Sequence, residues 1–361
     1  MFPKPIRVLL ADDSEIALSI LRRIFARSPE IEVVGAAKNG LEALRFAEQL
    51  EPTVVCTDLH MPVMDGLEFT ERLMQENPRP ILVISDAVHK EDADNVFRLL
   101  EAGALDVFPK PKGGSAEDYE CLAGELIRKV RILAGVKVFR KRCGKILGGA
   151  SPGAATPPAR SGNSRRSMRI VAMGASTGGP PAMLEILANL PQDFPVPLVC
   201  VQHISRGFLP SMVKWLDGHS KLKITIAETG VAPVKGHVYF APDDAHLEID
   251  AGGKLLLSQG EPYDGHRPSV TVLFRSVAQH YRQQAVGVLL TGMGRDGAEG
   301  MLDIVGRGGF TLAQSEDTCV VYGMPKQAIE AGAASSVLPL RKIAGKLKEI
   351  CAGGTVANVR T

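Results

Sequence analysis

Residues 6–13 read IRVLLADD, an apolar run that ends in two adjacent carboxylates. Four more short apolar runs follow in the first 110 residues, separated by stretches with helical spacing; they read IEVVGAA, TVVCTD, ILVIS and ALDVF. Near-continuous apolar strands that alternate with helices are typical of a parallel sheet covered on both faces. The sequence therefore predicts that the chain begins with an α/β domain.

The second half of the chain repeats this pattern. RIVAMGAS at 169–176, PLVCVQHI at 197–204 and AVGVLLTGMG at 285–294 are strand-like runs, and helical patterns accompany them. Between the second and the third run lie four shorter ones that resemble antiparallel strands: KITIAE, HVYFAP, HLEID and KLLLS. We therefore predict a second α/β domain that contains some antiparallel pairing.

A stretch without large apolar side chains separates the two halves. Apart from proline, residues 148–167 contain no apolar side chain larger than alanine, so they cannot bury enough surface to offset the entropy of ordering. An amphipathic helical pattern over residues 119–133 comes shortly before them. We predict a first domain over 1–135, a basic flexible linker over 136–168, a second domain over 169–350 and a tail over 351–361.

Composition narrows the class of protein. Of the 361 residues, 45% are hydrophobic and 23% are charged, which is ordinary for a soluble globular chain. No apolar run approaches the roughly 18 residues that a membrane helix needs, and the N-terminus does not resemble a signal peptide. The six cysteines are scattered, without zinc-like spacing. We predict a cytoplasmic protein without membrane insertion.

The formal net charge of +2 hides a local basic excess. Residues 126–184 contain twelve Lys or Arg and no Asp or Glu, and the rest of the chain is left with 30 basic against 40 acidic residues. A basic excess that lies in a linker, rather than on a folded face, does not favour nucleic-acid binding. We expect no nucleic-acid partner.

Polar residues end the strands of the first predicted sheet. Parallel α/β sheets carry their sites at the carboxyl ends of the strands, where this chain places Asp12, Asp13, Asp58, Ser85 and Lys110. Three converging carboxylates repel one another unless a divalent cation such as Mg²⁺ joins them. The alternative is that each acid is a solvated loop residue, but the joint pattern favours a site for a phosphoryl group on Asp58.

The first domain resembles the response-regulator receiver family. The family's D-D, D, S/T and K-P signatures correspond to Asp12-Asp13, Asp58, Ser85 and Lys110-Pro111. The resemblance implies a flavodoxin-like, doubly wound domain that binds Mg²⁺ and accepts a phosphoryl group on Asp58, with Ser85 and Lys110 as switch residues. Val107 departs from the family, because many receivers carry an aromatic residue three positions before the lysine.

A glycine-rich turn follows the first strand of the second domain. Residues 174–179, GASTGG, place Ser176 between a strand and a helix and match G-x-S-x-G. This pattern is also compatible with a structural turn or a phosphate-binding loop, although the Walker and dinucleotide fingerprints are both missing. A nucleophile turn is the favoured interpretation.

A nucleophilic serine needs a base, and the base needs an orienting carboxylate. His203 closes the strand LVCVQH, and Asp296 follows the strand AVGVLLTGMG. Each is compatible with a structural role by itself, and we expect His246 to be packed or hydrogen-bonded. The three candidates share one sheet, but their chain order differs from that of α/β-hydrolases.

The second domain is similar to the catalytic domain of the chemotaxis protein-glutamate methylesterase family, with a Rossmann-like α/β fold. The resemblance rests on these segments: GASTGGP, VQH, YFAP, HRPSVTVLFRSVA, LLTGMGRDGAEG and QSEDTCVVYGMPKQAIEAGA. It implies that Ser176 is the nucleophile, His203 the base and Asp296 its orienting partner. The chain departs from the family at Asp243-Asp244, where two glycines are usual, and at Thr271, where aspartate is usual.

The resemblance implies a phosphorylation-activated enzyme of bacterial chemotaxis or a related chemosensory pathway. It implies hydrolysis of glutamate γ-methyl esters, and deamidation of certain glutamines, on methyl-accepting chemotaxis receptors, with a chemotaxis histidine kinase as phosphodonor. No metal is expected at the esterase site, and the backbone N–H groups of Thr177, Gly178 and Met293 are candidate oxyanion donors. Two rival hypotheses stay open here, a serine peptidase and an adaptor whose esterase half is silent.

Overall fold

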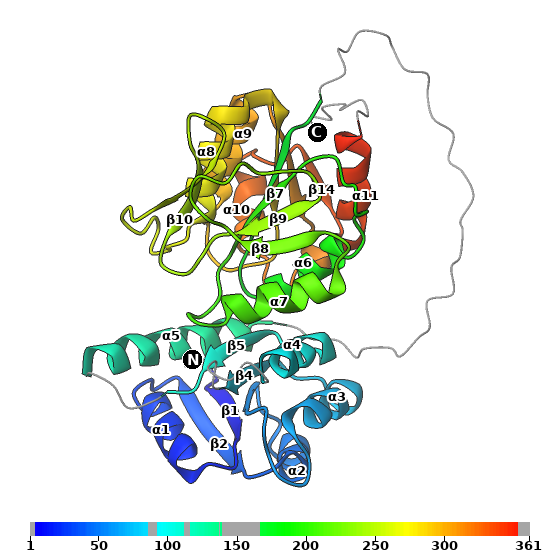
Figure 1. The fold of residues 1–361 in the computed structure, drawn as a ribbon. Coiled ribbons are helices and arrows are strands. Elements are labelled where there is room, and N and C mark those ends of the chain that lie inside the picture. The colour runs from blue at the N-terminus through cyan, green and yellow to red at the C-terminus, as the bar shows by residue number, and fades with distance from the viewer. Residues whose placement is uncertain (1–3, 86–91, 112–115, 137, 139–166, 353–361) are drawn as a thin grey trace.

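The computed structural model describes residues 4–85, 92–111, 116–136, 138 and 167–352. It contains two α/β domains, one built from the first 134 residues and the other beginning at β6 (Ile170–Ala175) (Figure 1). The predicted linker over 136–168 and the predicted tail over 351–361 lie almost wholly outside the described residues.

The first domain has the predicted doubly wound architecture. Its five parallel strands lie in the order β2-β1-β3-β4-β5. They are β1 (Ile6–Ala11), β2 (Ile31–Ala37), β3 (Val54–Thr57), β4 (Ile81–Ser85) and β5 (Asp106–Pro109). The helices are α1 (Glu15–Phe25), α2 (Gly40–Leu50), α3 (Gly66–Glu76), α4 (Asp92–Ala102) and α5 (Ala116–Ala134). Helices α1 and α5 cover one face of the sheet, and α2, α3 and α4 cover the other.

Side-chain caps begin the first three helices at the carboxyl ends of the sheet or close to them. The side chains of Ser14, Asn39 and Asp65 accept hydrogen bonds from the backbone N–H groups three residues further on. Such caps satisfy donors that the first helical turn leaves unpaired. They fix where each strand-to-helix loop ends, and so hold the loops that carry the acidic residues.

The second domain is a seven-stranded parallel sheet in the order β14-β13-β12-β6-β7-β9-β8, with a separate β10-β11 hairpin. Its further strands are β7 (Leu198–Gln202), β8 (Lys223–Ile226), β9 (His237–Phe240), β10 (His246–Ile249), β11 (Leu255–Ser258), β12 (Ala285–Leu289), β13 (Phe310–Gln314) and β14 (Ser336–Leu338). Helices α6 (Gly179–Leu187), α7 (Leu209–His219) and α11 (Leu340–Cys351) cover one face. Helices α8 (Val270–Tyr281), α9 (Ala298–Gly306) and α10 (Met324–Glu330) cover the other, and the 3-10 turns η1 (Arg282–Gln284) and η2 (Glu316–Thr318) complete the elements.

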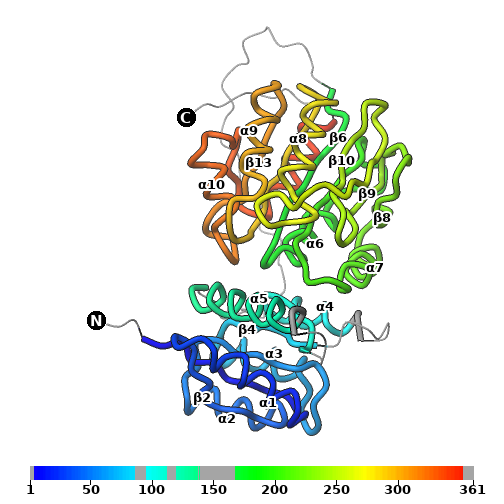
Figure 2. Tube along the Cα trace, turned by 90° about the vertical axis from the view of Figure 1, so that its left-hand side faces the viewer, coloured from blue at the N-terminus to red at the C-terminus, as the bar shows by residue number. Residues whose placement is uncertain are grey.

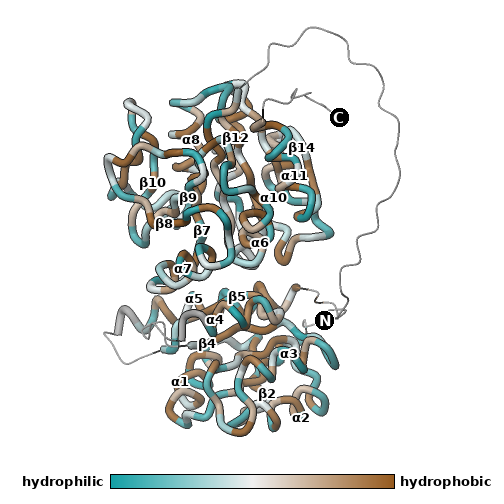
Figure 3. The backbone as a smooth tube through the Cα atoms, turned by 45° about the vertical axis from the view of Figure 1, so that its right-hand side comes forward, coloured by the Kyte–Doolittle hydropathy of each residue, from teal (hydrophilic) through white to brown (hydrophobic). Residues whose placement is uncertain are grey.

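The antiparallel expectation is wrong for two of the four short strands. Strand β9 pairs parallel with β7 and with β8, and only β10 and β11 form an antiparallel pair. Four-residue strands carry no signal of direction, and the segment between β8 and β9 contains no helix that would have revealed a parallel crossover. In Figure 3 hydrophobic residues are prominent along the central strands of both domains.

The two domains meet through α4 and α5 of the first domain (Figure 2). Phe97 of α4 stacks on Trp215 of α7 with ring centroids 5.1 Å apart, and the Trp215 indole donates to Glu101 at 3.1 Å. The buried cluster that contains Phe97 is continuous with the core of the second domain. No helix among the described residues has the length and apolar character to cross a membrane.

Candidate active site and phosphoacceptor site

The turn after β6 presents Ser176 at the N-terminus of α6. Gly178 adopts the left-handed conformation (φ +76°), which glycine reaches without strain, and α6 begins at the next residue. The Ser176 N–H donates to the Thr291 carbonyl at 3.0 Å, and the Thr291 hydroxyl donates to the Thr177 carbonyl at 3.0 Å. The loop after β12 therefore holds the serine turn from one side.

His203 is the first residue after β7, the strand that neighbours β6. Its N–H donates to the Ala175 carbonyl at 2.9 Å, so the sheet register sets it beside the serine turn. The His203 ring stacks on His266, with centroids 4.1 Å apart and 8° between the ring planes. Burial, with a smaller contribution from the neighbouring His203, lowers the pKa of His266 to about 4. His266 is therefore a neutral ring near pH 7.

Asp296 is almost completely buried, and the protein itself satisfies its carboxylate. One oxygen accepts from the Ser269 hydroxyl at 2.8 Å and the Thr271 N–H at 2.9 Å, and the other accepts from the Val270 N–H at 2.8 Å. These donors lie at the N-terminus of α8, where a helix favours negative charge. Burial alone would raise the pKa of the Asp296 carboxyl, but His203 and the Thr271 amide hold that pKa well below its usual range.

His203 and Asp296 are in contact, as the sequence predicts. Nε2 of His203 lies 3.0 Å from Oδ2 of Asp296, although the pair is not aligned as a hydrogen bond. Catalytic hydrogen bonds are often loose before substrate binds. Nδ1 of His203 has no hydrogen-bond partner among the described residues. The arrangement turns one ring nitrogen to the carboxylate and leaves the other to accept a proton.

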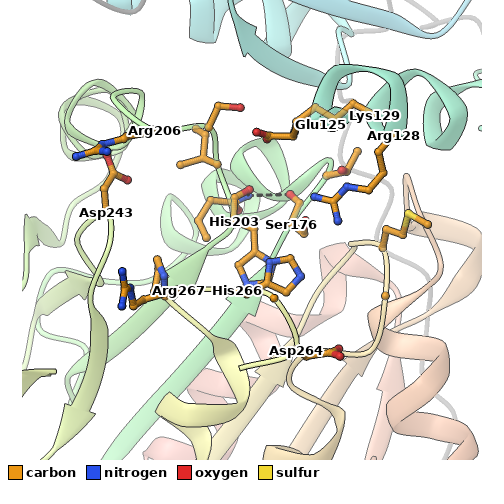
Figure 4. Close-up of a pocket in the computed structure, with 18 of the residues that line it drawn as sticks. Glu125, Arg128, Lys129, Ser176, His203, Arg206, Asp243, Asp264, His266 and Arg267 are labelled. Carbon is orange, nitrogen blue, oxygen red and sulfur yellow. Dashed lines mark hydrogen bonds between the residues drawn. The ribbon is translucent and has the colours of Figure 1, made fainter. Parts of the chain in front are cut away.

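Both domains line the pocket at this site, which has a volume of about 680 Å³ (Figure 4). Ser176, His203 and Met293 come from the second domain, and Arg128 comes from α5 of the first. In Figure 4 the Arg128 side chain extends from α5 toward Ser176. The first domain thus covers one side of the pocket.

The first domain also bonds directly to the serine turn. The Gly178 N–H donates to the Leu105 carbonyl at 3.2 Å, and the Thr177 hydroxyl donates to Asp106 at 3.1 Å. Lys129 of α5 pairs with the same Asp106 oxygen at 2.6 Å. Of the three predicted oxyanion donors, Gly178 is therefore engaged by the first domain in this arrangement.

The acidic residues of the first domain converge as predicted. Ligand oxygens of Asp12, Asp13 and Asp58 all lie within 4.8 Å of one another, and Asp12 and Asp58 are buried. Nζ of Lys110 lies 2.9 Å from Asp12 and 2.7 Å from Asp58. Burial raises the pKa of the Asp58 carboxyl to about 6, despite the opposing effect of Lys110. Clustered carboxylate oxygens of this kind suit Mg²⁺.

Ser85 and Val107 lie on adjacent strands of the first sheet. Ser85 is buried at the end of β4, and its carbonyl accepts from the Lys110 N–H at 3.0 Å. Val107 of β5 is buried in the core beside helices α2, α3 and α4. The aromatic position of many receivers is thus a packed valine in this chain.

Both departures in the second domain have structural roles. Asp243 accepts from the Gly207 N–H at 2.9 Å, and Asp244, at φ +60°, pairs with Arg206 at 3.0 Å. Burial raises the pKa of Asp243. The Thr271 hydroxyl accepts from the backbone N–H of the residue after Asp296 at 2.7 Å, so the threonine braces the loop of the buried acid.

Sequence reasoning missed several residues of the site, namely Gln202, His266, Ser269, Arg128 and Asp106. Ser269 follows Pro268 and caps α8, a signal for a helix start that the sequence contains. His246, by contrast, behaves as predicted: it is buried, its Nε2 contacts the Glu261 carbonyl at 3.0 Å, and its Nδ1 accepts from the Ser269 N–H at 3.2 Å. No local pattern indicates residues that act across the domain interface.

The fold and the two sites define a class of protein: a response regulator whose receiver domain is joined to an output domain with a serine-centred site. Two family models match the chain. The response regulator receiver domain matches residues 8–116, and CheB methylesterase matches residues 171–347.

Relatives match along nearly the whole chain. A protein-glutamate methylesterase/protein-glutamine glutaminase of Syntrophus aciditrophicus is 43% identical over 98% of this chain and 99% of its own length. One of Nitrosospira multiformis is 41% identical over 96% and 97%. The crystal structure of the Thermotoga maritima CheB methylesterase catalytic domain, 42% identical, covers 51% of this chain and 99% of its own, with a TM-score of 0.50. The chain belongs to the protein-glutamate methylesterase/protein-glutamine glutaminase family.

Proposed function

We propose that this chain hydrolyses glutamate γ-methyl esters of methyl-accepting chemotaxis receptors and deamidates specific glutamines there, in the cytoplasm. The observation that carries the proposal is that Ser176 and His203 line one pocket while the buried Asp296 contacts His203. Family membership supports the assignment of the substrate. In this proposal residues 136–168 form the linker and residues 351–361 the tail.

Ser176 is the proposed nucleophile and His203 the proposed base. Nδ1 of His203 takes the Ser176 proton as the hydroxyl oxygen attacks the ester carbonyl, and Asp296 stabilises the resulting imidazolium at Nε2. The carbon–oxygen bond to the methoxy group then breaks, and methoxide leaves as methanol with the proton from His203. A water molecule, deprotonated by His203, cleaves the acyl-serine to give glutamate. With a glutamine substrate, ammonia is the leaving group.

Backbone N–H groups are the proposed oxyanion donors. Thr177 and Met293 flank Ser176 from two loops, and undocking of the receiver releases the Gly178 N–H from Leu105. Removal of one such donor in other enzymes costs about 3–4 kcal/mol of transition-state stabilisation. The α6 N-terminus adds a favourable field at the same place.

The receiver is the proposed inhibitor of the esterase site. A receptor helix is bulky, and α5 with Arg128 lines the same pocket as Ser176 and so occupies space beside it. A chemotaxis histidine kinase is the proposed phosphodonor, and Asp58 the acceptor. Asp12, Asp13 and Asp58 would hold Mg²⁺, which neutralises charge on the incoming phosphoryl group. The added charge of about −1.5 to −2 shifts the receiver to a conformation that releases the interface.

The test is methanol release from methylated receptor together with labelling by a fluorophosphonate. Ser176→Ala loses a single hydroxyl and no packing, so we expect it to keep its melting temperature. It should lose at least about 10³-fold in rate and all labelling. Release of methanol by Ser176→Ala at close to the wild-type rate would show that the nucleophile is wrong. A wild-type chain that neither labels nor releases methanol after phosphorylation would favour a silent adaptor.

A further inference from the structure

A single buried amide links the serine turn to the residue that follows β7. Gln202 ends β7 and is 4% exposed, and its Nε2 donates to the Ser176 carbonyl at 2.8 Å and to the His203 carbonyl at 2.9 Å. The two acceptors belong to the proposed nucleophile and the proposed base. The strand pairing of β6 with β7 ends at Ala175 and Gln202, and the His203 N–H adds one further backbone bond to the Ala175 carbonyl. The Gln202 side chain is a second connection, and it reaches the Ser176 backbone in the loop beyond β6.

The orientation of the Gln202 amide is set by its partners. Both partners are carbonyl oxygens, which only an N–H group can approach favourably. The opposite orientation would turn Oε1 toward two oxygens. In the observed orientation Oε1 is buried without a hydrogen-bond partner among the described residues.

The serine turn is shaped around this side chain. A Cβ at Gly179 would lie 2.0 Å from Oε1 of Gln202 and 2.8 Å from its Cδ, so only glycine leaves room for the amide. The Gly179 N–H donates to the same Ser176 carbonyl at 2.8 Å. That carbonyl therefore accepts from two directions, which restrains the backbone orientation of Ser176.

We infer that Gln202 is a positioning residue that sets the distance between the Ser176 and His203 side chains. The inference rests on the proposed function, since it needs these two residues as nucleophile and base. Misplacement of a reacting group by about 1 Å costs on the order of 10²-fold in rate. Loss of the bridge should consequently lower kcat more than it changes KM, because the Gln202 amide donates to the backbone of Ser176 and His203.

The experiment compares two variants with a matched control in the full chain. Gln202→Met keeps the length of the side chain and removes both donors, and Gln202→Glu keeps the shape and places oxygens against the carbonyls. The control is Thr311→Val, which removes a buried hydroxyl that donates to the Ala333 carbonyl at 2.6 Å, on β13 and outside the residues that line the pocket. Melting temperature, kcat and KM for methanol release and the rate of fluorophosphonate labelling are measured for each.

We expect Gln202→Met to lower kcat and the labelling rate by about 10- to 100-fold with KM within about twofold, and Gln202→Glu to lower them further. Thr311→Val should lower the melting temperature and leave kcat unchanged. If Gln202→Met does not fold, Gln202→Leu, which also removes both donors, carries the same comparison. A lowered melting temperature with wild-type kcat in the Gln202 variants would overturn the inference. A wild-type chain that stays inactive when it is phosphorylated would instead overturn the proposed function.

Discussion

The two sites of this chain occupy the same place in similar folds and are built in opposite ways. Both lie at the carboxyl ends of parallel strands. In the receiver three carboxylates lie close together, and the ammonium group of Lys110 contacts the cluster. Burial raises the pKa of Asp58 to about 6. The esterase site contains one buried carboxylate, Asp296, which receives hydrogen bonds from three donors of the α8 N-terminus in addition to the His203 contact.

The receiver site is therefore suited to bind a signal, whereas the esterase site already has the arrangement that it needs for catalysis. Because the receiver site has excess negative charge, the binding of a cation or the addition of a phosphoryl group changes the relative free energies of the receiver conformations. The Asp296 carboxylate of the esterase site already accepts hydrogen bonds from the protein, so it is not free to bind a cation or a phosphoryl group. We therefore expect a phosphorylation signal to reach the esterase site through the interface between the domains, which includes Arg128, Leu105 and Asp106 beside the pocket.

The largest expected effect on the rate comes from a change to the buried carboxylate of the esterase site. Asp296→Asn replaces one carboxylate oxygen with an NH₂ group, which cannot accept from the α8 amides or stabilise the His203 imidazolium. We expect kcat to fall by about 10⁴-fold and the melting temperature to decrease. Methanol-release kinetics and thermal melting measure both. If kcat of Asp296→Asn were near that of the wild type, the claim that the Asp296 carboxylate is essential for catalysis would be wrong.

A smaller effect is expected at the interface. Arg128→Ala removes the guanidinium that extends toward Ser176, so we expect unphosphorylated methanol release to rise by about 3- to 10-fold, equivalent to about 1 kcal/mol of interface energy. The matched control is Arg131→Ala, three residues further along α5, which removes a hydrogen bond to Ser28 of 3.1 Å within the receiver. Equal rates for both variants and the wild type would remove Arg128 from the inhibitory contact.

The smallest effect concerns pH. Burial is the main cause that lowers the pKa of His266 to about 4. The neighbouring His203 and Arg128 lower it further, and the carboxylates of Asp296 and Asp264 oppose this change. Between about pH 6.5 and 4 the unfolded chain therefore binds a proton that the folded chain does not, so the free energy of unfolding decreases as pH falls. Between pH 7 and about 5.5 this proton uptake amounts to about 1 kcal/mol, so we expect the melting temperature of His266→Asn to fall about 2–4 °C less than that of the wild type. Parallel melting curves would show that His266 does not titrate in this way.

The sequence is sufficient to predict those strands and site residues that a local residue pattern marks. Apolar runs predict both sheets, and strand-end residues predict Asp58, Ser176 and His203, because the carboxyl ends of parallel strands meet at one edge. It failed for β8 and β9, whose four residues carry no signal of direction. It also missed Gln202, which looks like any polar strand end until its two acceptors are placed. Arg128 and Asp106 act across the domain interface, and no spacing in the sequence encodes such a contact.

The most direct test of the account is methanol release from methylated receptor by three forms of the protein. These are the full chain, the full chain phosphorylated by kinase with Mg²⁺, and residues 146–361 alone, with Asp58→Asn as the control that cannot be phosphorylated. We predict that the phosphorylated chain and the isolated second domain are both at least about tenfold faster than the unphosphorylated chain, and that Asp58→Asn stays slow. An isolated second domain slower than the unphosphorylated chain would contradict inhibition by the receiver.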